Sequence, residues 1–261
     1  MRLASNEIHL WFTFPNTIQD TDLLSEYRNL LAEEECIKHQ QFYFHSHRKQ
    51  YLVSRALMRT TLSQYTDVAP REWRFSTNQY GRPEIEWPII DLPLRFNLSH
   101  TRGLIVFAVA LQHSIGVDLE ATKCREVDVA MMARFFTPSE IRALHALPPS
   151  LHLDRFFEIW TLKEAYIKAR GVGLSIPLDK FSFQIEDDQP LRVSFDSQFN
   201  DLSHNWSFWI LQPTMQHKAA LALQIKPLNN VNLICQNAIP MRRTGPHKCS
   251  ILRSSCGNLC V

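Results

Sequence analysis

The first half of the chain contains hydrophobic residues at two different periods. Ile8 to Phe14 alternates apolar and polar side chains, as a half-buried strand does, and the stretches that follow repeat apolar residues at helical spacing. These helices are expected at residues 20–31, 33–44 and 48–65. After a turn that contains Gly81 and Pro83, strands are expected at residues 94–98 and 104–111, and the second is apolar enough to be central in a sheet. The pattern predicts an α+β fold for this half.

The second half of the chain repeats the order strand, helices, strands. A strand is expected at residues 114–120, and Thr137 followed by Pro138 is typical of a helix start. A long amphipathic helix beginning near Phe156 is expected to end at Gly171, the first residue of a Gly-Val-Gly sequence. Further helices are expected near residues 126–135 and 139–147, and further strands at 180–185, 191–195, 206–211 and 219–225.

This repeated order predicts two similar α/β lobes. We expect them at residues 1–112 and 113–226, related by pseudo-twofold symmetry, with the active site at the lobe interface. No residue-level repeat accompanies the repeated order of elements. Beyond Lys226 the periodicity decays among prolines, asparagines and cysteines, so residues 227–261 are expected to form a flexible C-terminal tail.

The composition narrows the class of protein only slightly. A chain of 261 residues that is 45% hydrophobic can bury a substantial core, and its formal net charge of +2 does not favour general binding to nucleic acid or membranes. The N-terminal sequence lacks the apolar core of a signal peptide, and the apolar run at 104–111 is too short to span a bilayer. The cysteines do not have the spread of a disulfide framework. We therefore expect a cytoplasmic protein with reduced thiols.

Two carboxylates lie on one face of the strand predicted at residues 114–120. Side chains alternate along a strand, so Asp118 and Glu120 project together while Val117 and Leu119 point into the core. Such carboxylates repel each other unless they share a proton or a cation, and oxygen ligands suit Mg²⁺. The alternative is an edge strand that carries two solvated acids.

The long helix supplies a third carboxylate and two lysines. Glu164 and Lys168 lie one turn apart on the same face, so the lysine could meet a phosphate beside a metal held by the glutamate. Lys163 lies one residue to the side and is a candidate for another phosphate oxygen. The alternative is an ordinary pair of opposite charges on a helix surface.

A third cluster lies at residues 96–103, where a strand ends in polar groups before a glycine. Ser99, His100 and Arg102 supply hydroxyl, imidazole and guanidinium donors of the kind that bind phosphate. The alternative is a hairpin that Ser99 and Thr101 close.

Together the three clusters resemble one family. The order N-L-S-H at 97–100, G-V-D-L-E at 116–120 and W-x-x-K-E-A-x-x-K-x-x-G-x-G-L at 160–174 resembles the 4′-phosphopantetheinyl transferases. It is most similar to the monomeric, two-lobed type that activates nonribosomal peptide, polyketide and polyunsaturated fatty-acid synthases. The resemblance extends over most of residues 7–225.

The resemblance implies an enzyme that transfers the 4′-phosphopantetheine moiety of coenzyme A (CoA) to a serine of an acyl or peptidyl carrier protein. The other product is adenosine 3′,5′-bisphosphate. The resemblance also implies that Asp118, Glu120 and Glu164 hold Mg²⁺, or Mn²⁺, against the CoA pyrophosphate, and that Lys168 neutralises the leaving phosphate. Glu164 is our candidate general base, and the alternative is that it only ligates the metal.

The resemblance further implies where CoA binds. Ser99 and His100 would contact its phosphates, and Arg82 and Arg48, with Lys38 as a weaker candidate, would contact the adenosine 3′-phosphate end. The family's second upstream lysine corresponds to Glu35 here. The residues expected to bind CoA are Lys38, Arg48, Arg82, Ser99, His100, Asp118, Lys163 and Lys168.

Carrier proteins of this class present an acidic helix, so a basic and apolar docking face is expected near the metal. The candidates are Lys123, Arg125, Arg134 and Phe135. The alternative is that Phe135 and its neighbour Phe136 both belong to the core.

Two alternative functions would require only some of these candidate residues. A Mg²⁺-dependent phosphodiesterase could use the carboxylates without a carrier-docking face, and a noncatalytic CoA-binding module would need only the basic residues. The histidine and cysteines of the tail, with His45 and His47, are candidate zinc ligands, but the tail lacks the paired C-x-x-C spacing of structural zinc sites. His45 and His47 are expected to be exposed at a helix start.

Overall fold

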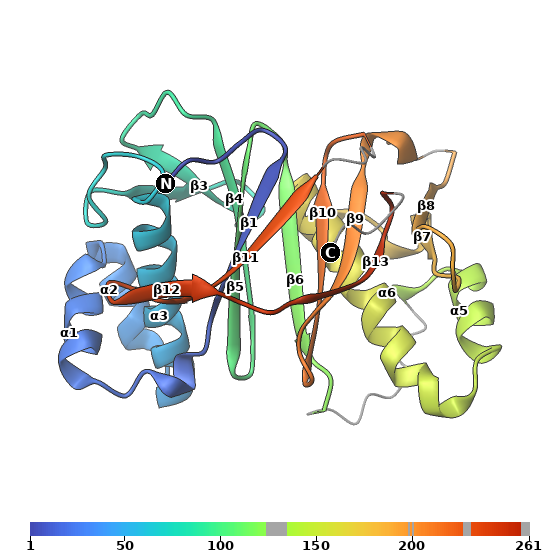
Figure 1. Ribbon diagram of the computed structural model, residues 1–261, viewed down its shortest axis with the longest axis horizontal. Helices are drawn as coiled ribbons and strands as arrows, with labels where there is room; N and C mark the ends of the chain where they lie inside the picture. Colours follow the sequence, from blue (N-terminus) through green and yellow to red (C-terminus); the bar gives the residue numbers. More distant parts are fainter. Residues whose placement is uncertain (124–134, 198, 200, 227–230, 257–261) are drawn as a thin grey trace. The chain divides into compact units, whose positions relative to one another are not determined.

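The computed structural model describes residues 1–123, 135–197, 199, 201–226 and 231–256 (Figure 1). The chain divides into two compact units. Unit 1 comprises Met1–Gln112 with Asn232–His247, and unit 2 comprises His113–Val231 with Lys248–Val261. Helices and strands occur in both, so the fold is α+β as predicted. Among the described residues, no helix is long and apolar enough to cross a membrane.

The sheet of unit 1 has the strand order β12-β11-β1-β5-β4. Strand β5 pairs antiparallel with both β1 and β4, which confirms its predicted central position. Its residues from Leu104 to Ala110 are buried, as expected of a strand covered on both faces. The bounds are β1 (Glu7–Thr13), β4 (Leu94–Thr101), β5 (Leu104–Leu111), β11 (Asn232–Ile239) and β12 (Arg243–Pro246).

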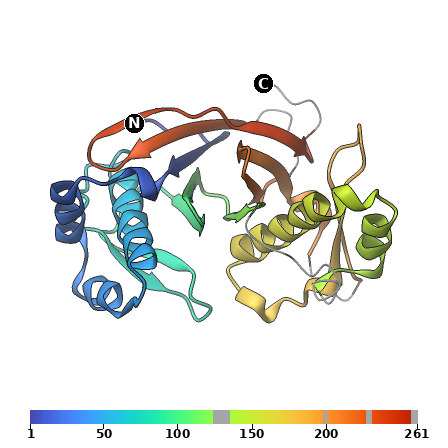
Figure 2. The ribbon, with the colours of Figure 1, turned by 90° about the horizontal axis from the view of Figure 1, so that it is seen from below.

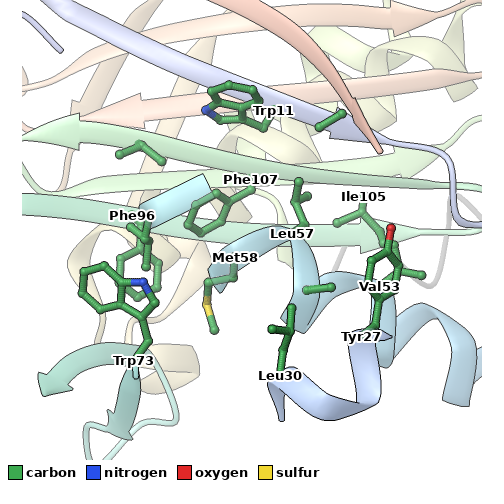
Figure 3. Close-up of a cluster of buried hydrophobic side chains, with 14 of the residues drawn as sticks. Trp11, Tyr27, Leu30, Val53, Leu57, Met58, Trp73, Phe96, Ile105 and Phe107 are labelled. Atoms are coloured by element: carbon green, nitrogen blue, oxygen red, sulfur yellow. The ribbon is translucent and has the colours of Figure 1, made fainter. Parts of the chain in front are cut away.

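The predicted helices of unit 1 are confirmed, with shifted ends. They are α1 (Thr21–Leu30), α2 (Glu33–Gln41) and α3 (His45–Leu62), and a small hairpin of β2 (Arg74–Thr77) and β3 (Pro83–Trp87) follows. Asp20 caps α1, since its carboxylate accepts from the backbone N–H groups of Asp22 and Leu23. Trp11 and Phe107 of the sheet and Leu57 of α3 belong to one buried core (Figure 3).

The sheet of unit 2 has the strand order β13-β9-β10-β6 and is covered by the long helix α6 (Figure 2). The bounds are β6 (Ile115–Ala121), β9 (Ser207–Thr214), β10 (His217–Leu223), β13 (Ser250–Ser254), α5 (Pro138–His145) and α6 (Pro149–Arg170). A hairpin of β7 (Phe181–Gln184) and β8 (Arg192–Phe195) completes the described part of this unit. The helix predicted near residues 126–135 lies almost entirely outside the described residues.

Two helix boundaries in unit 2 follow the predicted signals. Thr137 caps α5, because its hydroxyl accepts from the N–H of Glu140, whose carboxylate in turn accepts from the N–H of Thr137. Helix α6 ends at Gly171, whose φ of 66° lies in the left-handed region that glycine adopts without strain. Helix α6 starts earlier than predicted, at Pro149.

Part of the expected tail forms strands in both units: β11, β12 and β13 lie within residues 232–254, which corrects the prediction of a flexible tail there. Strand β11 pairs in parallel with β1, β12 pairs with β11, and β13 pairs with β9. These strands are held largely by main-chain hydrogen bonds, because most residues of β11 are only half-buried. Their mixed polar sequence therefore lacks the strong alternation by which the other strands were recognised.

Candidate active site

The site in unit 2 depends on a close contact between β6 and α6 at Gly116. A Cβ atom at Gly116 would lie 2.1 Å from the carbonyl oxygen of Ala165 and 2.3 Å from the backbone nitrogen of Ala169. A residue with a side chain would separate the helix from the strand here. Because side chains alternate along a strand, Asp118 and Glu120 lie on the same face as Gly116 and project toward α6.

Asp118 and Lys168 form an ion pair between these two elements. The Nζ atom of Lys168 lies 2.6 Å from Oδ1 of Asp118, a distance typical of a strong charge-assisted hydrogen bond. The Asp118 side chain is 8% exposed and that of Lys168 is 29% exposed. The structure thus brings together two predicted site residues that are far apart in the sequence, and leaves the lysine accessible to a ligand.

Glu164 lies near both carboxylates of β6. Burial raises its pKa above the ordinary value, and the negative charges of Asp118 and Glu120 raise it further, while Lys168 opposes this rise. Glu164 therefore interacts electrostatically with the other two predicted metal ligands, Asp118 and Glu120. Neighbouring negative charges of this kind favour the binding of a cation.

The donor set fits a hard divalent cation. Asp118, Glu120 and Glu164 offer only carboxylate oxygens, which are the ligands that Mg²⁺ and Mn²⁺ prefer. In the described part of the chain no group of at least three His, Cys, Asp or Glu side chains is close enough together to enclose an ion. Because Asp118 pairs with Lys168, the carboxylates would have to move toward one another to share a metal.

Lys163 lies in a different environment, which corrects its predicted contact with CoA. Its Nζ atom donates to the carbonyl oxygens of Leu178 and Phe181, both at 2.6 Å, and lies 2.9 Å from Oε2 of Glu140. The side chain is fully buried, so all three ammonium donors are satisfied inside the protein. Burial lowers the pKa of Lys163 and Glu140 opposes that change. The lysine joins α6 to α5 and β7 and cannot reach a phosphate in solvent.

The predicted CoA contacts other than Asp118, Lys163 and Lys168 all belong to unit 1. Lys38 of α2 is exposed and Arg48 of α3 donates to the carbonyl oxygen of Phe42 at 2.8 Å. Arg82 forms an ion pair with Glu84 at 2.7 Å. On β4, Ser99 is 5% exposed and His100 is exposed.

Glu35 has a structural role that accounts for its departure from the family pattern. Its carboxylate lies 2.6 Å from the guanidinium of Arg59, which is fully buried, and 3.5 Å from that of Arg55. Both arginines belong to α3, so Glu35 fastens α2 to α3. A lysine at this position would place a third positive charge beside the two arginines.

The predicted docking residues are described only in part. Lys123 is exposed, and Phe135 is 42% exposed with its ring 5.7 Å from that of Trp160. Arg125 and Arg134 lie outside the described residues. Phe136 is 3% exposed and stacks on Phe156, so this neighbour of the docking candidates belongs to the core.

Sequence reasoning did not identify Lys218 as a residue beside the carboxylates. It is buried in β10 directly opposite Glu120 and binds Asp154 and Glu158 of α6. A charged residue inside the apolar strand at 217–223 was the available signal, because a buried lysine requires a compensating charge.

Comparison with known proteins connects this arrangement to one family. Residues 114–223 match the model of the 4′-phosphopantetheinyl transferase superfamily, and residues 20–112 match that of the 4′-phosphopantetheinyl transferase N-terminal region. The chain is 34% identical to the 4′-phosphopantetheinyl transferase Sfp of Bacillus subtilis over 168 residues, which are 64% of this chain and 72% of Sfp.

A second relative matches over more of its length. The chain is 30% identical to the 4′-phosphopantetheinyl transferase HetI of Nostoc sp. over 223 residues, which are 85% of this chain and 90% of HetI. The solved structure of the Thermotoga maritima holo-[acyl-carrier-protein] synthase matches 43% of this chain and 63% of its own at 19% identity, with a TM-score of 0.35. On its similarity to HetI, the chain belongs to the 4′-phosphopantetheinyl transferase superfamily.

Proposed function

We infer that this protein is a 4′-phosphopantetheinyl transferase that transfers the phosphopantetheine moiety of CoA to a serine of an acyl or peptidyl carrier protein. Membership of the superfamily supports this activity. The single observation that supports the proposed site is the effect of the Asp118 and Glu120 charges on the pKa of Glu164, beside the ion pair of Asp118 with Lys168. This arrangement suits a reaction at a diphosphate, which needs both a cation and fixed positive charge.

The reaction exchanges one phosphorus–oxygen bond for another. The carrier serine oxygen attacks the phosphorus that bears the pantetheine arm, and the bond from that phosphorus to adenosine 3′,5′-bisphosphate breaks. The serine hydroxyl loses its proton, and Glu164 is the candidate acceptor. A carboxylate beside a divalent cation stays ionised at neutral pH, which is the state that can accept this proton. In the alternative, Glu164 serves only as a metal ligand.

A divalent cation, Mg²⁺ or Mn²⁺, would be held by Asp118, Glu120 and Glu164, and when bound it supplies positive charge to the pyrophosphate. Lys168 serves the leaving phosphate. Its ammonium is already positioned by Asp118 at 2.6 Å, and its side chain is exposed enough to meet a phosphate oxygen. As negative charge develops on the leaving group, this fixed cation stabilises it.

The binding of the rest of CoA is proposed to use the polar residues of unit 1. Lys38, Arg48 and Arg82 would meet the 3′-phosphate end, and Ser99 and His100 the other phosphates. Their donor chemistry supports this part of the proposal, since guanidinium, ammonium, hydroxyl and imidazole groups all bind phosphate oxygens. The pseudo-twofold relation of the lobes and a shared active site stay predictions.

The carrier protein is proposed to dock on the basic and apolar side chains of unit 2. The exposure of Lys123 and Phe135 supports their part in this face. Arg125 and Arg134 stay predictions, as do the monomeric state, the cytoplasmic location and the class of synthase served.

Intact-protein mass spectrometry tests the proposed function. The protein is incubated with CoA, Mg²⁺ and a panel of apo carrier proteins, and the carriers and the small-molecule products are both weighed. We expect a carrier serine to gain the mass of one phosphopantetheine group as adenosine 3′,5′-bisphosphate appears. Cleavage of CoA with every carrier unmodified would instead indicate a phosphodiesterase, and binding of CoA without cleavage would indicate a noncatalytic module.

A further inference from the structure

A buried lysine lies across the sheet from one of the proposed metal ligands. Lys218 of β10 is 3% exposed and stands directly opposite Glu120 of β6. Directly opposed residues of an antiparallel pair point to the same face of the sheet, with Cβ atoms about 5 Å apart. The flexible lysine side chain is therefore long enough to reach the Glu120 carboxylate.

The ammonium group of Lys218 is bound to α6. Its Nζ atom lies 2.6 Å from Oδ1 of Asp154 and 3.0 Å from Oε1 of Glu158. The other carboxylate oxygen of Glu158 accepts from Nε of Arg155 at 2.9 Å, and Arg155 also donates to the carbonyl oxygen of Ile185 at 2.7 Å. Glu158 is therefore held in place from two sides and is only 8% exposed.

These contacts fasten α6 to the sheet at a second point. The first point is Gly116, against Ala165 and Ala169, and the second is the binding of Lys218 to Asp154 and Glu158. From Glu158 to Ala165 the helix rises about 10 Å, and from Gly116 to Glu120 the strand rises about 13 Å. The two contact points are thus similarly spaced on the strand and on the helix, with Asp118 and Glu164 between them and Glu120 at the second point.

We propose that Asp154 and Glu158 are positioning residues that keep the positive charge of Lys218 on α6, so that this lysine does not compete with a divalent cation for the Glu120 carboxylate. The proposal rests on the proposed function. Two carboxylates on α6 outcompete the single carboxylate of Glu120 for the ammonium, because they together place more negative charge within hydrogen-bond distance. Without them, the lysine would turn to Glu120 and occupy one metal ligand.

Mn²⁺ binding followed by electron paramagnetic resonance tests this proposal. The titration contains CoA and no carrier protein, so that no transfer occurs. We expect the double variant Asp154→Asn/Glu158→Gln to bind Mn²⁺ roughly 10-fold or more weakly, within the range for residues that support metal ligands indirectly. Adding Lys218→Met to that variant removes the competing charge, so we expect the affinity to return to within about 3-fold of the wild type.

In variants that stay folded, the rescue tests whether the charge of Lys218 causes the loss of Mn²⁺ affinity. A triple variant that binds Mn²⁺ no better than the double variant would overturn the proposal. Wild-type affinity in the double variant would also overturn it. Circular dichroism checks folding, and Glu158→Gln alone, with and without Lys218→Met, gives the same ranking with Asp154 retained.

A matched control uses a lysine in an exposed ion pair of the same unit. Lys180 lies 3.7 Å from Asp196, and both side chains are partly exposed, so Lys180→Met is expected to leave Mn²⁺ binding unchanged. If the wild type bound no Mn²⁺, the metal site of the proposed function would fail together with this proposal. If the wild type bound Mn²⁺ and the variants matched it, only this proposal would fail.

Discussion

Helix α6 has charged residues on two sides, and the groups that surround them differ in charge. On the side of α5 and β7, the ammonium of Lys163 has one carboxylate and two carbonyl oxygens around it and no access to solvent. On the side of β6, Glu164 faces two further carboxylates, and its pKa is raised. The charge of Lys163 is thus balanced by its partners, whereas the carboxylates near Glu164 make its charged form less favourable.

This difference indicates how a structural charge can be told from a functional one. Burying a charge costs several kcal/mol per ion, so a charge that stabilises a fold is surrounded by partners, as Lys163 is. A fold that instead leaves Asp118 and Glu164 in mutual repulsion gives up stability at that position. Binding of a cation can restore this stability, so we assign the β6 side of α6 to the binding of metal and CoA.

Replacing Asp118 should have the largest effect. Asp118→Asn keeps the shape of the side chain and removes its charge, so we expect carrier modification to slow by roughly 10³-fold or more, because the charge stabilisation supplied by a metal is worth several kcal/mol. The rate is measured by intact-protein mass spectrometry at saturating Mg²⁺. Turnover close to that of the wild type, in a variant with an unchanged circular dichroism spectrum, would contradict the assignment.

Replacing Lys163 should affect stability rather than chemistry. Lys163→Met leaves the Glu140 carboxylate buried without its cation, so we expect the free energy of unfolding to fall by about 3–5 kcal/mol. Urea denaturation measures the change. Adding Glu140→Gln should recover part of the loss, and the absence of any recovery would show that the ion pair is not the cause.

Lys168→Met, on the other side of α6, is the matched comparison for Lys163→Met. Lys168→Met should lower the rate of transfer roughly 100-fold, as the loss of one fixed transition-state donor does, and should destabilise the protein less than Lys163→Met. Transfer rates and urea denaturation of both variants give the result. The comparison fails if the two substitutions change rate and stability in the same proportion.

The smallest expected effect is a gain of stability on removing Glu164. Its pKa is raised above 4.5 in the folded protein, so in the absence of metal its ionisation destabilises the fold as the pH rises through that raised pKa. Glu164→Gln should therefore stabilise the metal-free protein at neutral pH, and the gain should vanish below the pKa of the unfolded chain. Urea denaturation across this pH range would contradict the account if the variant were less stable at neutral pH.

The sequence predicted the fold well where burial imposes a strong period. Strand β5 is apolar along its length, and α1 repeats apolar residues at helical spacing, so both were recognised. Strand β11 was missed, because its half-buried position between β1 and β12 places little demand on side-chain polarity. Backbone pairing at such positions leaves little trace in the sequence.

The sequence predicted which residues belong to the candidate site where the spacing of residues within a motif is sufficient to identify them. Asp118 and Lys168 were identified from separate motifs, and the structure brings them to 2.6 Å. The burial of Lys163 was not predictable, because it depends on Glu140 and on backbone carbonyl groups from other elements. Adjacent residues of a helix point in directions about 100° apart, so neighbours in one motif can face different surroundings.

The location of a bound metal tests the central claim most directly. Crystals of the protein with CoA and Mn²⁺ would show the ion by its anomalous scattering. We predict a single strong peak in contact with carboxylate oxygens of Asp118, Glu120 and Glu164 and with oxygens of the CoA pyrophosphate. An ion bound to the pyrophosphate with no contact to these three side chains would contradict the account.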